Sequence, residues 1–313
     1  MEIVSTFEAI EKPYKNAVIT IGNFDGVHIG HQALFRTVID KAEAIHGTAV
    51  AMTFDPHPLR VLSPNSHPPM ITMPEQKAEL IAKTGMEVLI RIPFTREFAA
   101  ISARDFVERL LMERIGMRAM VVGNDYAFGR NREGNLALLQ QWSEELGFDV
   151  LVVDWVHTAN GMKDRISSTQ IREQVMAGDM TAAKRMLGRH YQIRGVVATG
   201  RNRGGRLLGF PTANILIQDE LCPKEGIYAV TVEHDGQTFP GVANIGYSPT
   251  FDDHLFTIEV HLLDFDRNIY NDPIRVNFIQ RLRDEIKFDS LDELTARIRQ
   301  DVVQARQILS GMQ

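Results

Sequence analysis

The feature that most constrains the fold is a regular alternation, from Ala17 to about residue 155, of short β-branched apolar runs and longer amphipathic stretches. This alternation is typical of strands joined by helices in a mostly parallel sheet. The strand candidates are AVITIG, TAVAMTF, EVLIRIPF, AMVVG and DVLVVDWV. The amphipathic stretches between them end on Gly47, Gly85, Gly116 and Gly147. Because glycine closes a helix in the left-handed conformation without penalty, we predict an α/β domain with helices ending at these positions.

After about residue 186 the pattern changes to short strands at close spacing, separated by turn signals such as HDGQ. The candidates are YQIRGVVA, TANILI, GIYAVTVE, QTFPGVANIG, LFTIEVHLLDF and IRVNFI, which predict a small antiparallel barrel or sandwich. A C-terminal helix follows, with Ser290 and Glu293 as a capping box. Its expected apolar face is Leu291, Leu294, Ile298 and Val302. We therefore predict two domains, residues 1–186 and 187–313, and a proline-rich loop from 63 to 74 inside the first.

The composition limits what the chain can bind. It holds 34 Lys and Arg against 40 Asp and Glu, a net charge of −6, so it has no global positive field for nucleic acid or an anionic membrane. Its single cysteine, Cys222, excludes an internal disulfide framework and a thiolate zinc cage. No uncharged apolar run reaches bilayer length, and the first residues do not form a signal peptide. We expect a soluble, cytoplasmic protein that acts on small molecules, and the sequence leaves its oligomeric state open.

Basic residues nevertheless gather in one stretch. From Met180 to Gln218 there are seven and no acidic residue: Lys184, Arg185, Arg189, Arg194, Arg201, Arg203 and Arg206. Both a polyphosphate site and a solvated charged face fit such a run. The glycines of GRNRGGRLLGF favour the polyphosphate site, although this loop lacks the GK[ST] ending of a Walker A loop.

The motif GNFDGVHIGHQALF directly follows the strand AVITI and precedes a helix. It contains Gly22, Gly26 and Gly30. Glycines let the backbone approach a ligand, and the helix start presents N–H groups and a positive dipole end to an anion. His28 and His31 are three residues apart and share one face of that helix start, where imidazoles can donate to phosphate oxygens. Separately, a glycine turn or a surface histidine is more often structural, but together they indicate a phosphate site.

GNFDGVHIGHQ resembles the nucleotide-binding signature of the HxGH nucleotidylyltransferases. Its exact residues resemble the form of this signature in the bacterial bifunctional riboflavin kinase/FAD synthetase family. TFDPHP, GNDYAFGRNREG and ISSTQIR resemble the adenylyltransferase half of that family. GRLLGFPTANI, GVANIGYSPTF and IEVHLLDF resemble its kinase half. The resemblance covers nearly the whole chain in order. It implies a Rossmann-like nucleotidylyltransferase domain followed by a small antiparallel β-barrel with a C-terminal helix. The implied enzyme uses ATP and Mg²⁺ to phosphorylate riboflavin to FMN, and then adenylylates FMN to FAD with release of pyrophosphate.

For the first domain, the resemblance implies a phosphate site made by the glycine motif and by ISSTQIR. Its members would be Gly22, Asn23, Phe24, Asp25, Gly26, Gly30, Ser167, Ser168 and Thr169. His28, His31 and Arg172 would act on the triphosphate as pyrophosphate leaves. The role of Asp25 stays open, and Ser167 with Gln170 also fits a simple capping box.

The implied flavin contacts are Asp55, His57, Asn124, Asp125, Tyr126, Phe128 and Arg283. FDPHP is equally consistent with a proline-locked turn. GNDYAFG follows a strand, so its residues lie at the carboxyl edge of the sheet, where open α/β folds bind ligands. Tyr126 and Phe128 can stack on a flavin or adenine ring, or can fill the core. Arg281, Arg283 and Phe288 can cover the flavin, or can belong to a charge cluster at a helix edge.

In the second domain the resemblance makes Glu259 the general base that takes a proton from the ribityl hydroxyl. Thr212 and Asn214 would hold Mg²⁺, and Arg201, Gly205 and Arg206 would bind ATP phosphates. By strand alternation alone, Glu259 lies opposite Phe256, Ile258, Val260 and Leu262, as a solvated strand glutamate would. An attacking alcohol needs a base, whereas the phosphate of FMN is already anionic and needs positioning instead.

The chain departs from the family pattern in three places: a longer RNRGG loop, IYND from 269 to 272 in place of tyrosine–glycine, and Ser248 in place of a commonly basic residue. We expect these differences to affect substrate affinity or lid motion in the kinase half, and not its chemistry.

Two other functions stay open. One is an adenylyltransferase for a different acceptor, with a non-catalytic barrel, and the other is a non-enzymatic flavin carrier. Thr212, Asn214 and Glu259 argue against the first, and the His28, His31 and Arg172 set argues against the second.

Overall fold

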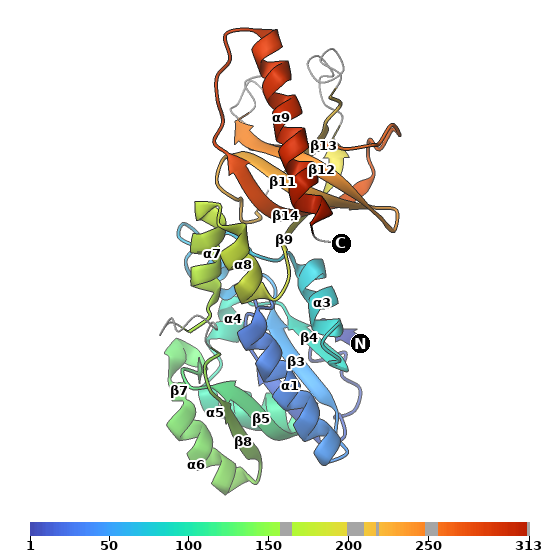
Figure 1. Ribbon diagram of the computed structural model, residues 1–313. Helices are drawn as coiled ribbons and strands as arrows, with labels where there is room; N and C mark the ends of the chain where they lie inside the picture. Colours follow the sequence, from blue (N-terminus) through green and yellow to red (C-terminus); the bar gives the residue numbers. More distant parts are fainter. Residues whose placement is uncertain (157–164, 199–209, 217–218, 248–255, 312–313) are drawn as a thin grey trace. The chain divides into compact units, whose positions relative to one another are not determined.

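The computed structural model describes the chain except for residues 157–164, 199–209, 217–218, 248–255 and 312–313 (Figure 1). The chain divides into two compact units, Met1–Ser168 and Thr169–Gln313. Helices α7 (Ser168–Ala177) and α8 (Met180–Leu187) therefore fall mostly in the second unit, whereas the sequence pattern changes only after them.

The first unit is built on a six-stranded parallel sheet with the order β1-β4-β3-β2-β5-β8. The strands are β1 (Glu2–Val4), β2 (Ala17–Ile21), β3 (Ala49–Phe54), β4 (Val88–Ile92), β5 (Met117–Gly123) and β8 (Asp149–Val153). The predicted α/β fold is confirmed, but β1 was not predicted, because only one of its three residues is buried. The strand order reverses at β2, which lies between β3 and β5, and such a switch point is where open α/β sheets bind ligands.

Helices cover both faces of this sheet (Figure 1). On one face, α1 (Ile29–Ala44) and α3 (Pro74–Ala82) bury Phe35, Val38 and Ile81. On the other, the π-helical η1 (Phe106–Ile115) and α6 (Leu136–Leu146) bury Leu111 and Leu139. The shorter elements are α2 (Pro58–Leu62), α4 (Arg96–Ala99), α5 (Ala103–Asp105), β6 (Ala127–Phe128), η2 (Arg130–Arg132) and β7 (Gly134–Asn135). Burial on both faces explains why the strands are continuous apolar runs.

Three of the predicted helix ends have the expected left-handed glycine, at Gly85, Gly116 and Gly147 with φ of 96°, 85° and 77°. The end of α1 was predicted wrongly. There His46 takes the left-handed conformation, with φ of 51°, and Gly47 does not. Gly47 is required for a different reason, because a Cβ at this position would collide with the carbonyl oxygen of Asn16.

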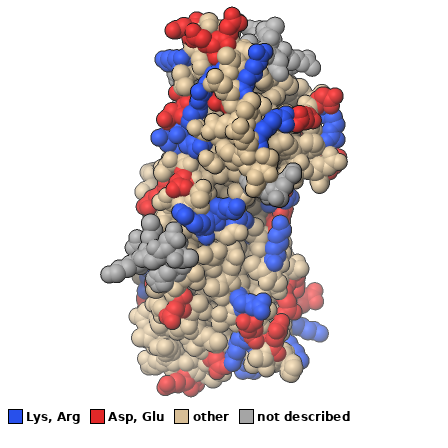
Figure 2. Space-filling model, in the orientation of Figure 1, with Lys and Arg blue, Asp and Glu red and all other residues tan. Residues whose placement is uncertain are grey.

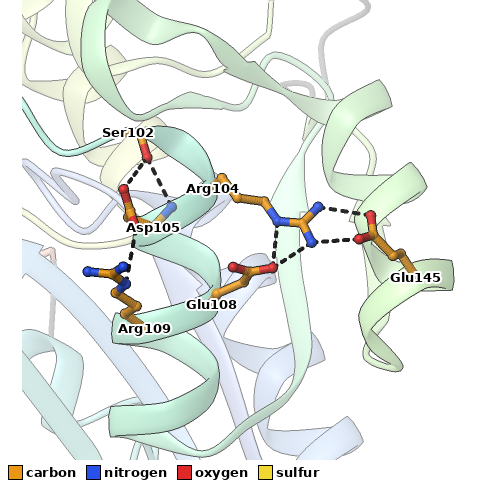
Figure 3. A network of polar contacts seen from close by, with 6 residues as sticks. All are labelled: Ser102, Arg104, Asp105, Glu108, Arg109 and Glu145. Atoms are coloured by element: carbon orange, nitrogen blue, oxygen red, sulfur yellow. Dashed lines mark hydrogen bonds and ion pairs between the residues drawn. The ribbon is translucent and has the colours of Figure 1, made fainter.

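An ion-pair network connects α5 and η1 to α6 (Figure 3). Ser102 begins α5 by accepting the Asp105 N–H at 3.1 Å. Arg104 donates to Glu108 at 2.5 Å, and its two terminal nitrogens donate to Glu145 on α6 at 2.8 and 2.6 Å. These side chains are partly exposed, so we expect the network to orient the two helices more than to stabilise them.

The second unit contains a closed barrel with the order β10-β13-β12-β11-β14-β9, in which all described pairings are antiparallel. The strands are β9 (Tyr191–Ala198), β10 (Ala213–Leu216), β11 (Gly226–His234), β12 (Gln237–Tyr247), β13 (Phe256–Leu262) and β14 (Pro273–Arg283). This confirms the small antiparallel β-barrel.

The C-terminal helix α9 (Leu291–Ser310) packs on the barrel, as expected. Ser290 accepts the Glu293 N–H at 3.2 Å, so the predicted cap is present. The predicted apolar face is wrong at its first residue, because Leu291 is 68% exposed. The helix instead packs through its second half, with Val302, Ala305, Ile308 and Leu309 in a cluster with β11 and β12 residues.

Basic and acidic side chains are intermixed on the face shown in Figure 2, in line with the nearly balanced composition. Within the basic stretch, Lys184 and Arg185 are exposed on α8, and Arg189 and Arg194 are half-buried. Burial, with Arg194 nearby, lowers the pKa of Arg189 to about 10. Arg201, Arg203 and Arg206 lie outside the described residues.

Candidate functional site

The glycine motif forms a loop between β2 and α1 that turns sharply on itself. Phe24, Gly26 and Val27 all have positive φ, of 47°, 87° and 41°. The Phe24 ring is 2% exposed and packs edge-on against Phe35 of α1, with ring centroids 4.8 Å apart. A Cβ on Gly22 would lie 2.8 Å from the Phe24 ring, so only glycine fits there. The aromatic ring therefore fixes the loop to the helix that follows it.

The two histidines of the motif lie against each other at the start of α1. Their rings stack with centroids 3.5 Å apart and an interplanar angle of 19°. His28 is the N-cap, and its Nδ1 accepts the His31 N–H at 3.3 Å. Because Nδ1 accepts, the neutral ring carries its proton on Nε2, which becomes the nitrogen able to donate to a ligand. Gly30 leaves room for this ring, since a Cβ there would lie 3.1 Å from it.

Asp25 connects this loop to the proline-rich segment before α3. Its side chain is 2% exposed, and Oδ1 accepts the N–H groups of Ile71 and Thr72 at 3.1 and 3.0 Å. The Thr72 hydroxyl donates to Asp25 at 3.2 Å and accepts the Gly26 N–H at 3.0 Å. These contacts give Asp25, whose role the sequence left open, a structural task in holding the loop.

A buried lysine that the sequence did not reveal lies beneath the same loop. Lys77 on α3 is 3% exposed, and its Nζ donates to the Asn23 carbonyl at 3.0 Å and to the Thr53 hydroxyl at 3.3 Å. The Thr53 hydroxyl in turn donates to the same carbonyl at 3.1 Å. Burial lowers the pKa of Lys77, although the Asp25 and Asp55 carboxylates act in the opposite direction. A lysine in an amphipathic helix carries no sequence signal that it will be buried.

The ISSTQIR segment contacts the loop through Ser168, whose hydroxyl donates to the Asp25 carbonyl at 2.8 Å. Ser167 precedes α7, and Thr169 and Arg172 lie on that helix in the second unit. The structure thus brings Ser168 to the glycine motif, and contacts of the other three with a nucleotide stay predictions.

FDPHP ends β3 and starts α2. His57 is 9% exposed and caps α2, with Nδ1 accepting the Leu59 N–H at 3.2 Å. Asp55 is half-buried, with its Oδ2 3.9 Å from a guanidinium nitrogen of Arg91. The segment therefore makes the turn that its prolines suggest, which is compatible with a ligand contact at Asp55.

At the carboxyl ends of β5 and β8, the polar residues of GNDYAFG have partners. Asn124 donates to Asp154 at 3.2 Å, and Asp125 accepts from Arg165 at 2.8 Å. The Arg165 guanidinium also lies 4.1 Å from the centre of the Trp155 ring. Asn124 and Asp125 thus stand at the predicted sheet edge, beside an arginine and a tryptophan that no motif had singled out.

The two aromatics of this motif have different surroundings. Phe128 is 8% exposed and packs against Phe106 and Trp142, with ring centroids 6.1 and 6.3 Å away, so it fills the core. Tyr126 stacks on Phe128 at 5.3 Å and is only partly buried as a residue. Its hydroxyl oxygen is buried, has no hydrogen-bond partner within the described chain, and burial raises its pKa. Tyr126 therefore has a hydroxyl donor that no described residue of the chain accepts.

In the barrel, Glu259 stands in a row of polar side chains. It pairs in register with Asn214 of β10 on one side and with Asn244 of β12 on the other. Its strand neighbours Ile258 and Val260 are fully buried, so the row lies on the opposite, outward face, as the alternation predicted. Asn244 was not predicted, because cross-strand register cannot be read from a single strand.

Glu259 differs from a solvated strand glutamate. Burial raises the pKa of its carboxyl, and the nearby Glu285 carboxylate adds to the effect. Glu285 lies against Gly246, two residues beyond Asn244 on β12. The Asn244 Oδ1 is buried and accepts no hydrogen bond from any described residue. The row thus combines a carboxylate that holds its proton more tightly than usual with an unused acceptor.

The segment that carries Thr212 is fixed from the same face. His261, two residues after Glu259, bonds through Nδ1 to the Pro211 carbonyl at 2.8 Å, and the carbonyl can only accept. The Phe210 ring packs edge-on against His261 at 5.5 Å. Thr212 directly precedes β10, whose second residue is Asn214. Arg201, Gly205 and Arg206 lie outside the described residues.

Arg283 binds the C-terminal helix. Its Nε lies 2.9 Å from the Asp301 Oδ1, and a terminal nitrogen lies 2.6 Å from Oδ2. Asp301 is 2% exposed. Arg283 thus belongs to a charge cluster at a helix edge, one of its two predicted roles, and it anchors α9. A contact of Arg283 with flavin stays a prediction.

Within the described residues, no set of three or more His, Cys, Asp or Glu side chains could hold a metal ion alone. No described helix is long and apolar enough to cross a membrane.

Two family models match the chain, FAD synthetase over residues 10–170 and riboflavin kinase over residues 187–309. The chain is 36% identical over 307 residues to the bifunctional riboflavin kinase/FMN adenylyltransferase of Haemophilus influenzae, covering 98% of each chain. It is 39% identical to the protein of the same name from Listeria monocytogenes, covering 95% of this chain and 94% of the relative.

A solved structure described as a macrolide-efflux protein from Streptococcus pneumoniae superposes with a TM-score of 0.86 at 31% identity, covering 97% of this chain and 98% of that one. The agreement of the fold, the two motif sets and the full-length relatives favours a bifunctional enzyme over both alternative functions. The chain belongs to the bifunctional riboflavin kinase/FMN adenylyltransferase family, whose two activities convert riboflavin to FMN and FMN to FAD.

Proposed function

We propose that residues 1–186 adenylylate FMN and residues 187–313 phosphorylate riboflavin, each with its own set of residues. The observation that carries this division is that the stacked pair His28 and His31 lies in one compact unit, while Asn214 and Glu259 lie in the other. The separate family matches, 10–170 and 187–309, support the same division.

In the first part, an oxygen of the FMN phosphate attacks the α-phosphorus of ATP and pyrophosphate leaves. Because the attacking phosphate is already anionic, this step needs alignment and donors rather than a base. The α1 N-terminus, the Nε2–H of His28, and His31 supply donors to phosphate oxygens. Ser167 and Ser168 complete the phosphate contacts of this unit, while Asp25 holds the loop in shape. Thr169 and Arg172 stay predictions as phosphate ligands.

The flavin of FMN lies at the carboxyl edge of the sheet in this proposal. Asp55, His57, Asn124 and Asp125 contribute polar contacts, and Tyr126 contributes its buried, unused hydroxyl. Phe128 supports Tyr126 from beneath through their stacked rings.

In the second part, Glu259 accepts the proton of the terminal ribityl hydroxyl as that oxygen attacks the γ-phosphorus of ATP and ADP leaves. The raised pKa of Glu259 suits a base that must take up a proton during the step. Asn244 lies beside it and accepts a hydrogen bond from the ribityl chain. Arg201, Gly205 and Arg206 bind the ATP phosphates.

Mg²⁺ fits the oxygen donors of Thr212 and Asn214, because this ion prefers hard oxygen ligands and is usually completed by substrate phosphates and water. When bound, the ion neutralises charge on the phosphate oxygens.

The test is chromatography of flavins after incubation with ATP and Mg²⁺. We expect Glu259→Gln to stop FMN formation from riboflavin while added FMN is still converted to FAD. We expect the double change His28→Ala with His31→Ala to give the reverse. Loss of both reactions in either folded variant would refute the division.

A further inference from the structure

We infer that Lys77 is a positioning residue for the ATP phosphates in FMN adenylylation, and that it acts through the backbone carbonyl of Asn23. This inference rests on the proposed role of the loop from Gly22 to Gly30 as the triphosphate site. Lys77 belongs to none of the motifs that identify the family, and it lies on α3 rather than on the loop.

The first argument is charge. Lys77 is 3% exposed, and both of its hydrogen bonds go to uncharged oxygens, those of Asn23 and Thr53. No ion pair joins its Nζ to a described carboxylate, although the Asp25 and Asp55 carboxylates lie near enough to raise its pKa against the effect of burial. Because a buried ammonium group without an anion in direct contact is costly, a phosphate bound at the loop would stabilise this lysine.

The second argument is the orientation of a peptide group. The Asn23 carbonyl receives Lys77 Nζ at 3.0 Å and the Thr53 hydroxyl at 3.1 Å, so it is held toward α3 and β3. In a trans peptide the C=O and the following N–H point in opposite directions. The Phe24 N–H is therefore turned away from Lys77, and it has no hydrogen-bond partner among the described residues. A fixed, unused N–H in such a loop is a donor for a phosphate oxygen.

Together these observations give Lys77 two effects on the binding of the ATP triphosphate at this loop. Its hydrogen bond holds the peptide that presents the Phe24 N–H, and its charge lies beneath the loop where it attracts the triphosphate. Thr53 contributes only to the first effect, because its hydroxyl is uncharged. Removal of Lys77 should therefore weaken ATP binding at the adenylylation site more than removal of the Thr53 hydroxyl.

The experiment measures KM for ATP in both reactions of the full-length enzyme, so that the kinase reaction is an internal control. For Lys77→Met we expect KM for ATP to rise about tenfold or more in FMN adenylylation, and to stay unchanged in riboflavin phosphorylation. The matched control is Lys83→Met, which makes the same change at an exposed position directly after α3 and should alter neither value.

Thr53→Val keeps the lysine and should raise KM for ATP in FMN adenylylation by a smaller factor. This variant still tests the inference if Lys77→Met does not fold. Unchanged KM for ATP in both variants, or an equal rise in both reactions, would overturn the inference. His28→Ala separates this failure from a failure of the site itself. If His28→Ala leaves adenylylation intact, the proposed phosphate loop is wrong. If it impairs adenylylation while Lys77→Met and Thr53→Val do not change KM, only the role of Lys77 is wrong.

Discussion

Glu259 shows how its neighbours change the chemistry of one side chain. Burial and the Glu285 carboxylate both raise its pKa, and in the proposed role of general base Glu259 acts only when it is deprotonated. The kinase rate should therefore fall on acidification at a pH above the ordinary glutamate value of 4.5.

Glu285→Gln removes the neighbouring negative charge, so we expect the acid limb of riboflavin phosphorylation to move to lower pH. The measurement is kcat/KM for riboflavin against pH, with FMN adenylylation by the same sample as the control. An acid limb that does not move would show that Glu285 does not act on the base.

A change at Asn244, the cross-strand neighbour of Glu259 on β12, tests the opposite effect, the addition of a negative charge. Asn244→Asp places a second carboxylate beside Glu259, and like charges make the loss of a proton harder. We expect the acid limb to move to higher pH by about one unit. Asn277→Asp, on the outward face of β14, serves as a control of equal charge and should leave the limb in place. A limb that shifts equally in both variants would contradict the proposed row.

At the level of elements, α9 is attached to β14 by a buried ion pair between Arg283 and Asp301, whose side chains are 11% and 3% exposed. Asp301→Ala leaves the guanidinium buried without its partner, so we expect the second unit to lose about 3–5 kcal/mol in its free energy of unfolding. The measurement is denaturant unfolding, followed together with the loss of kinase activity.

Asp264→Asn is the matched control, because it removes the charge that pairs with Arg306, also on α9, in an ion pair whose side chains are 67% and 48% exposed. Asparagine tolerates the left-handed φ of 57° at this position. We expect little change in stability there, since exposed pairs contribute little. Equal destabilisation by the two variants would contradict the structural role given to Arg283.

The elements themselves were largely predictable, because burial on both faces of a sheet and alternation in a barrel leave clear patterns in the sequence. The errors have local physical causes. Edge strand β1 has too little burial to show a pattern. After α1 the left-handed residue is His46, while Gly47 is required by its close approach to the Asn16 carbonyl oxygen. Leu291 is exposed because α9 packs through its later turns.

The candidate sites were predictable only where a motif carried them. His28, Asn214 and Glu259 were proposed as site residues from family motifs and local spacing, and their roles stay predictions. Lys77 and Asn244 were not, since the first depends on how α3 packs under a distant loop and the second on register between strands. Contacts between segments far apart in the chain cannot be read from local patterns.

At the level of the whole molecule, the full-length relatives and the two family matches describe one chain with two successive activities. FMN is the product of one and the substrate of the other. If the two sites are chemically independent, two variants with opposite defects should complement each other through FMN in solution.

The most direct test of this independence mixes the Glu259→Gln variant with the variant that carries both His28→Ala and His31→Ala, and supplies riboflavin, ATP and Mg²⁺. Chromatography then measures FAD over time. We predict that neither variant alone forms FAD from riboflavin and that the mixture does, after a lag in which FMN accumulates. A mixture that forms no FAD, from two folded variants, would contradict the account.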